Sequence, residues 1–279
     1  MSRKELLARL EEAPRLSPFL VLGDPTPELS VELARAAVDA GAGMIEIGFP
    51  YGDPVADGPA IQAACQRALL AGTSTSKAIE LLARIHDAVP ETPLNLLVYG
   101  NLVHRRGLDR FVEDVAGAGA SSLLVPDVPL EENAPLRRAC RKGKIAHVEL
   151  VGPLTAPERL SRLDNAASGF LYLVAHQGIT GVRGGGFEPV RELVARTVSR
   201  VRNPVCLGFG LSKREQIESA FEAGARLAVV GSHLASGIGA AWGSGGKDAA
   251  ERVVSSFRSA VRALKPALRE GRVQPCSSS

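Results

Sequence analysis

The sequence predicts a single (β/α)8 barrel, a closed ring of parallel strands in which each strand is followed by a helix. Short apolar runs alternate with segments of helical period along most of the chain. The apolar runs are continuous, which is typical of strands covered on both faces. The length of 279 residues suits one large α/β domain. The competing fold is an open doubly wound sheet, but no G-x-G-x-x-G motif follows the first apolar run.

The order of elements follows from these patterns. The N-terminal stretch MSRKELLARLEEA is amphipathic and predicts an extra helix before the barrel. Helical segments then include ELSVELARAAVDAGA, LDRFVEDVAGAGA, ENAPLRRACRKG and KREQIESAFEAGA, several of which end in Gly-Ala, a suitable helix stop. The predicted strands are residues 19–22, 44–47, 94–98, 122–125, 146–150, 169–174, 205–207 and 227–230.

The C-terminal region predicts one last helix, AAERVVSSFRSAVRAL, preceded by a flexible connection, SGIGAAWGSGGKD. We therefore expect residues 1–265 to form the barrel domain. The remaining tail, 266–279, ends in VQPCSSS and is expected to be disordered.

Composition excludes several classes of protein. The net charge is only +3, and the basic residues are mixed with acidic ones, which argues against a nucleic-acid-binding surface. The four cysteines lack metal-type spacing. Neither a signal peptide nor an apolar run of membrane-spanning length is present. We expect a cytoplasmic enzyme that does not bind membranes or nucleic acid.

A carboxylate at the end of a buried strand marks the first candidate site. In EIGFPYGDPVADGP, Glu46 falls late in the second predicted strand, and Asp53 and Asp57 follow in a loop of Gly and Pro. Chemistry in such barrels occurs where strands end and loops begin. Two carboxylates there can divide acid and base roles, because burial raises the pKa of one while a polar loop leaves the other ionised. A purely structural interpretation makes Glu46 part of an ion pair and Asp57 a turn or helix-capping residue.

Two glycine-rich turns follow the last two predicted strands, GFGLS at 208–212 and VVGSHL at 229–234. Glycine lets backbone N–H groups approach an anion, and Ser212 and Ser232 supply hydroxyls near helix starts. These positions in a barrel are common phosphate sites. A third loop, HQGITGVRGGG at 176–186, has Thr180 at its centre and the position of a lid.

These blocks, together with PFLVLGDPTPELS, YGNLV and LLVPDVPLEE, resemble the signature blocks of the tryptophan synthase alpha subunit family, in the family's order. The resemblance extends from about Leu6 to about Lys265. It implies a lyase of tryptophan biosynthesis that cleaves indole-3-glycerol phosphate to indole and D-glyceraldehyde 3-phosphate without a metal or organic cofactor. It also implies a beta-subunit partner in an alpha2beta2 heterotetramer.

The resemblance also assigns roles to individual residues. Glu46 matches the acid–base carboxylate, and Asp57 matches the group that accepts the indole N–H. Thr180 matches the lid residue that closes onto Asp57, whereas Asp53 lies in the partner-facing loop. The matched indole-pocket residues are Phe19, Leu97, Tyr99, Leu124 and Tyr172, although each is also an ordinary core residue at a strand end. The matched phosphate-binding residues are Gly181, Gly208, Phe209, Gly210, Gly231 and Ser232.

Several positions depart from the family pattern. Gly52 stands in place of a usual Ser, Glu149 lies where an apolar residue is usual, and His176, Gln177, Pro126 and His233 are further differences. They leave open a stand-alone lyase that supplies indole to another pathway. Two rival functions also stay open: a weakly catalytic subunit that activates a beta-type partner, and a sugar-phosphate isomerase with the same type of barrel.

Overall fold

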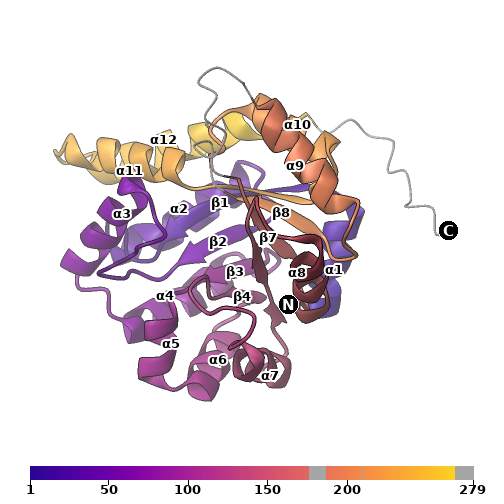
Figure 1. Cartoon of the computed structure of the whole chain (residues 1–279). Coiled ribbons are helices and arrows are strands. Elements are labelled where there is room, and N and C mark those ends of the chain that lie inside the picture. The colour runs from indigo at the N-terminus through magenta and orange to yellow at the C-terminus, as the bar shows by residue number, and fades with distance from the viewer. Residues whose placement is uncertain (176–186, 209, 268–279) are drawn as a thin grey trace.

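Parallel strands close into a barrel that is surrounded by helices (Figure 1). The computed structural model describes residues 1–175, 187–208 and 210–267, and within them nine strands form one sheet in the order β5-β4-β3-β2-β1-β9-β8-β7-β6. This confirms the predicted barrel. The strands are β1 (Arg15–Val21), β2 (Ile45–Gly48), β3 (Leu94–Leu97), β4 (Ser122–Leu124), β5 (Ala146–His147), β6 (Glu149–Val151), β7 (Leu171–Val174), β8 (Val205–Gly208) and β9 (Leu227–Val230).

Two strands differ from the prediction by more than two residues at an end. The predicted strand 146–150 is divided into β5, which pairs with β4, and β6, which pairs with β7, so the chain itself joins the two edges of the sheet. Val148 lies between the two pieces, and its side chain is buried in the barrel interior. Strand β1 begins earlier than predicted. The prediction started too late because Ser17 and Pro18 interrupt the apolar pattern, yet both residues pair with β9.

The helices cover the outer face of the barrel (Figure 1). Their apolar faces and the outward-facing strand residues form the larger hydrophobic core. The described helices are α1 (Arg3–Glu12), α2 (Pro27–Asp39), α3 (Pro59–Leu70), α4 (Thr75–Ala88), α5 (Gly100–Arg106), α6 (Leu108–Gly117), α7 (Ala134–Lys142), α8 (Pro157–Ala166), α9 (Glu188–Val198), α10 (Arg214–Glu222), α11 (Ser232–Gly243) and α12 (Ala249–Leu264). None of them is long and apolar enough to cross a membrane.

The predicted connection before the last helix is largely helical. The sequence predicts a flexible connection over residues 236–248, but α11 extends to Gly243. Its residues Leu234 and Ile238 are buried, and Gly239 packs so closely that a Cβ there would lie 2.9 Å from Arg67 Nη1. Tertiary packing of this face therefore outweighs the low helix propensity of its glycines.

The predicted N-terminal helix closes the amino-terminal end of the barrel. In α1, Leu6 and Leu10 are buried among the side chains that fill the barrel, including Met44 and Leu227 at strand starts. Burial of each leucine contributes about 2 kcal/mol to stability. The helix begins with a capping box in which Ser2 and Glu5 satisfy each other's backbone N–H groups.

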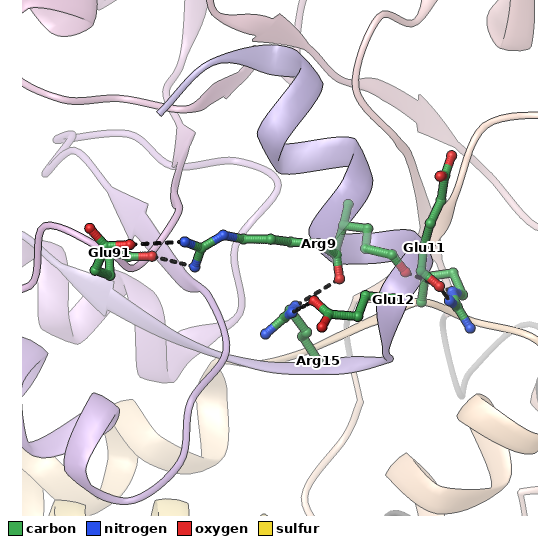
Figure 2. Close-up of polar contacts among 7 residues, drawn as sticks. Arg9, Glu11, Glu12, Arg15 and Glu91 are labelled. Carbon is green, nitrogen blue, oxygen red and sulfur yellow. Dashed lines mark hydrogen bonds and ion pairs between the residues drawn. The ribbon is translucent and has the colours of Figure 1, made fainter. Parts of the chain in front are cut away.

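Polar contacts hold the C-terminal end of α1 in place (Figure 2). Arg9 forms an ion pair with Glu91, with Nη2 3.0 Å from Oε2. The Arg15 guanidinium donates to the Arg9 carbonyl at 3.0 Å and contacts Glu12. Arg226, next to β9, donates to the carbonyls of α1 residues Leu10 and Glu11. The helix is thus attached to the start of β1 and to the turn before β9.

A buried ion pair ties α3 to the end of β1, next to the mouth of the barrel. Asp24 accepts from Arg67 in a bidentate arrangement, with Oδ1···Nε at 2.7 Å and Oδ2···Nη2 at 2.9 Å. The Asp24 side chain is 2% exposed. Burial raises the pKa of Asp24, and the Arg67 guanidinium opposes that rise. The carboxylate therefore depends on Arg67 to remain charged inside the fold.

We expect Arg67→Ala to lower the free energy of unfolding by about 3 kcal/mol, because it leaves a buried carboxylate without its partner. Arg35→Ala is the matched control, because Arg35 pairs with Glu32 on the exposed face of α2 and should cost about 0.5 kcal/mol or less. Urea unfolding of both variants measures the difference. Equal losses would show that the Asp24–Arg67 pair does not stabilise the fold.

Candidate active site

A cavity of about 350 Å³ opens at the carboxyl ends of the strands. Its walls come from β1, β2, β3, β7 and β9, from the start of α3 and from the turns that precede α10 and α11. Both predicted carboxylates, Glu46 and Asp57, line it. The structure thus brings them together at the end of the barrel where such enzymes place their chemistry.

Glu46 projects from β2 into the interior and is 1% exposed. The Asn95 side-chain amide donates to its Oε1 at 2.8 Å, and the Tyr172 hydroxyl donates to its Oε2 at 3.0 Å. Burial raises the pKa of Glu46 to about 7, against the lowering effect of these two hydrogen bonds, and nearby Asp57 raises it further. No basic side chain contacts Glu46 in the described residues. Within the described part of the chain Glu46 therefore forms no ion pair, and the carboxyl can exchange a proton near neutral pH.

Asp57 lies just before α3 but does not cap it. Gly58 is the N-cap residue and Pro59 occupies the first turn. The Asp57 carboxylate instead accepts from the Tyr99 hydroxyl at 2.9 Å, and the same hydroxyl accepts from the Ala56 backbone N–H at 3.2 Å. The Asp57 side chain is thus bound by Tyr99 instead of serving as the helix cap. Burial raises its pKa as well, so both carboxyls are partly desolvated.

The predicted apolar pocket is divided between the cavity wall and the layer behind it. Phe19, Leu97 and Tyr172 line the cavity. Leu124 is buried in the same interior cluster without lining the cavity. Tyr99 stacks on Tyr51 with ring centroids 5.1 Å apart, and its hydroxyl reaches Asp57. Tyr99 therefore orients a carboxylate in addition to packing.

Small and polar residues form another part of the cavity wall. Gly210, Gly231 and Ser232, which were predicted to bind a phosphate, line the cavity together with Ser212. Gly231 is the N-cap residue of α11, so the first turn of that helix opens at the cavity. Unpaired backbone N–H groups at a helix start favour an anion. Thr180, Gly181 and Phe209 lie outside the described residues.

Gly208 has a different environment from the other predicted phosphate residues. It does not line the cavity, and a Cβ at this position would lie 2.2 Å from Tyr172 Cε1 and 2.3 Å from the Tyr172 hydroxyl. The absence of a side chain at Gly208 therefore makes room for the Tyr172 ring that reaches Glu46.

Sequence reasoning missed two site residues. Asn95 interrupts the apolar run LNLLV of β3, a signal that could have identified it as a partner for a buried charge. His233, in the first turn of α11, lines the cavity beside Ser232. It is the one basic side chain among the described residues that line the cavity.

Two other departures from the family pattern, Gly52 and Glu149, do not line the cavity. Gly52 is exposed, and a Cβ there would meet no atom within 4 Å. Glu149 has the partner that its burial required, because the Asn133 amide donates to its Oε1 at 2.7 Å. Burial raises the pKa of Glu149 to about 7. His176 and Gln177 lie outside the described residues.

Comparisons with known proteins give one family. A family model described as tryptophan synthase alpha chain matches residues 7–268. The tryptophan synthase alpha chain of Methanothermobacter thermautotrophicus is 41% identical over 84% of this chain and 86% of its own. That of Enterobacter sp. (strain 638) is 36% identical over 95% and 96%. The solved tryptophan synthase alpha2beta2 complex from Pyrococcus furiosus contains a chain with a TM-score of 0.80 and 34% identity, covering 90% of this chain and 98% of its own.

A side chain at position 208 would collide with the Tyr172 ring. Gly208→Ala should displace the Tyr172 ring and weaken its hydrogen bond to Glu46, so kcat should fall by about tenfold or more while KM changes little. Gly210→Ala, in the cavity wall, should mainly raise KM for a phosphate substrate. Steady-state kinetics of both variants measure the contrast. A rise in KM with unchanged kcat in Gly208→Ala would instead support the phosphate role assigned by resemblance.

Proposed function

The chain belongs to the tryptophan synthase alpha chain family, and we propose that its cavity cleaves indole-3-glycerol phosphate to indole and D-glyceraldehyde 3-phosphate. The observation that carries this proposal is the pair of carboxyls on one cavity, with the pKa of the buried Glu46 raised to about 7. Such a group can both give and take a proton at neutral pH. The product indole would serve L-tryptophan biosynthesis.

Glu46 supplies the proton traffic of the retro-aldol reaction. The protonated carboxyl gives its proton to C3 of the indole ring, which turns the ring into an electron sink. The bond between C3 and the side chain then breaks, and its electron pair restores the aromatic ring. The hydroxyl proton of the departing side chain returns to Glu46 as the aldehyde forms, so the carboxyl ends the cycle as it began.

Asp57 stabilises the positive charge that develops on the protonated ring. A carboxylate that accepts the indole N–H can offset this charge, because burial has already removed part of its hydration. The Tyr99 hydroxyl and the rigid turn before Pro59 hold the carboxylate in position. Preorganisation of this kind places the negative charge before the reaction starts.

The substrate phosphate would lie at the glycine-rich side of the cavity. Gly210, Gly231 and Ser232 allow close approach of an anion to the first turn of α11. This side faces the same cavity as Phe19 and Leu97, whose apolar side chains suit an indole ring. No group of three or more His, Cys, Asp or Glu side chains in the described residues could hold a metal ion.

We further propose that the chain acts as an alpha subunit beside a beta subunit, as in the alpha2beta2 complex of Pyrococcus furiosus. The loop between β2 and α3 exposes Val55, which is 77% exposed although it is apolar. This loop matches the partner-facing loop of the family, so Val55 is available for a partner contact. Cys65, Cys140 and Cys206 are buried thiols rather than disulfides, which fits a reducing cytoplasmic compartment.

Glu46→Gln tests the proposed chemistry. Removal of the proton carrier should lower kcat for indole formation by about 10² to 10⁴. Glu149→Gln is the matched control, because Glu149 is also buried and its pKa is also raised to about 7, yet it does not line the cavity. Its kcat should stay within about threefold of the native value. Indole release is followed by absorbance, and native turnover in Glu46→Gln would refute the role of Glu46.

Val55→Asp tests the partner surface. A charge in this loop should weaken association with a tryptophan synthase beta subunit by about tenfold or more and reduce the gain in kcat that the partner provides. Leu70→Asp is the matched control, because Leu70 is an apolar residue that is 81% exposed at the C-terminal end of α3, outside the loop that carries Val55. Calorimetric titration with the beta subunit gives the affinities. A chain that is fully active alone and unaffected by any beta subunit would instead be a stand-alone lyase.

A further inference from the structure

Three interior residues occupy one level of the barrel on neighbouring strands. Glu46 of β2 is in register with Asn95 of β3, and Asn95 is in register with Ser122 of β4. Residues paired in this way project to the same side of a parallel sheet. The three side chains therefore meet inside the barrel, where each is at most 1% exposed.

Hydrogen bonds join the three side chains into a chain that ends at the carboxyl. The Ser122 hydroxyl donates to Asn95 Oδ1 at 2.6 Å, and Asn95 Nδ2 donates to Glu46 Oε1 at 2.8 Å. The serine hydroxyl thus occupies the carbonyl end of the amide and leaves its NH2 end directed at Glu46. Asn95 does not line the cavity, so its influence on a substrate must act through Glu46.

The two oxygens of Glu46 have chemically different partners. An amide NH2 group can only donate, so it opposes a proton on Oε1. A tyrosine hydroxyl can donate or accept, so Tyr172 at Oε2 accommodates either state of the carboxyl. The titratable groups around Glu46 are Asp57 before α3, Tyr172 on β7 and Cys206 on β8.

We propose that Asn95, held by Ser122, is a positioning residue that keeps Oε1 of Glu46 as a hydrogen-bond acceptor, so that Oε2 carries the proton transferred in the reaction. The proposal deepens the function proposed above and rests on it only for its kinetic consequence. Oε2 gives its proton to C3 of the indole and recovers the proton of the substrate hydroxyl, while Oε1 keeps its bond to Asn95 throughout.

The test is a titration of Glu46 by carboxyl NMR, with Glu46→Gln assigning the resonance. Asn95→Leu removes a donor that stabilises the ionised carboxyl while conserving volume, so the Glu46 titration should move up by about one to two pH units. Ser122→Ala should move it less in the same direction, because the amide loses its anchor. Ser121→Ala is the matched control, because the Ser121 hydroxyl accepts from the Leu94 backbone N–H instead, and it should leave the titration unchanged.

The double variant Asn95→Leu/Ser122→Ala removes the hydroxyl that the single variant leaves unpaired, and it repeats the test if Asn95→Leu does not fold. A downward movement in the variants would overturn the proposal, because it would mean that the amide accepts from the protonated carboxyl. An unchanged titration would overturn it as well.

Kinetics separate this proposal from the proposed function. If both hold, kcat falls in Asn95→Leu with little change in KM, and the alkaline fall in kcat moves up with the titration. If the titration moves while Glu46→Gln retains native turnover, the positioning holds and the catalytic role of Glu46 is refuted. If Glu46→Gln is inactive while the titration stays unchanged, only the positioning is refuted.

Discussion

The desolvation of one carboxyl group governs the site. Glu46 stands inside the barrel, where the loss of hydration favours its protonated form. Two hydrogen bonds, from Asn95 and Tyr172, offset part of this cost. Burial alone would hold the carboxyl protonated at neutral pH, and full hydration would leave it ionised. The balance between burial and hydrogen bonding makes it responsive near pH 7.

This balance has a cost for the fold. A glutamate is ionised in the unfolded chain above its ordinary pKa of 4.5, whereas Glu46 in the folded chain stays protonated until about pH 7. The stability that goes with the protonated form is fully present below pH 4.5 and is lost as the pH rises through 7. Packing elsewhere in the barrel must offset this loss.

The fold was predictable from the sequence because its signals are local. Continuous apolar runs and helix stops recur along the chain, and the barrel follows from their alternation. The division of β5 from β6 was not predictable, because it depends on which neighbouring strand each residue pairs with. Helix α11 was missed because its glycines predict flexibility, although one of them, Gly239, lies against the Arg67 guanidinium.

The site was predictable where chemistry stands out against its surroundings, as with Glu46 and Asp57. The site was less predictable where one residue acts on the substrate through another residue. Asn95 was visible only as a polar residue in an apolar strand, and its function depends on the register that places it beside Glu46. The role of Gly208 depends on the rotamer of Tyr172, which no local pattern encodes.

The N-terminal helix determines which end of the barrel a small molecule can use to enter or leave. With Leu6 and Leu10 packed among the side chains at one end, the interior is closed there, and its cavity opens at the strand ends beside the β2–α3 loop. Indole that forms in the cavity must leave through the end by which its precursor entered. The surface beside that exit carries Val55, so a partner docked there would receive the product before bulk water does.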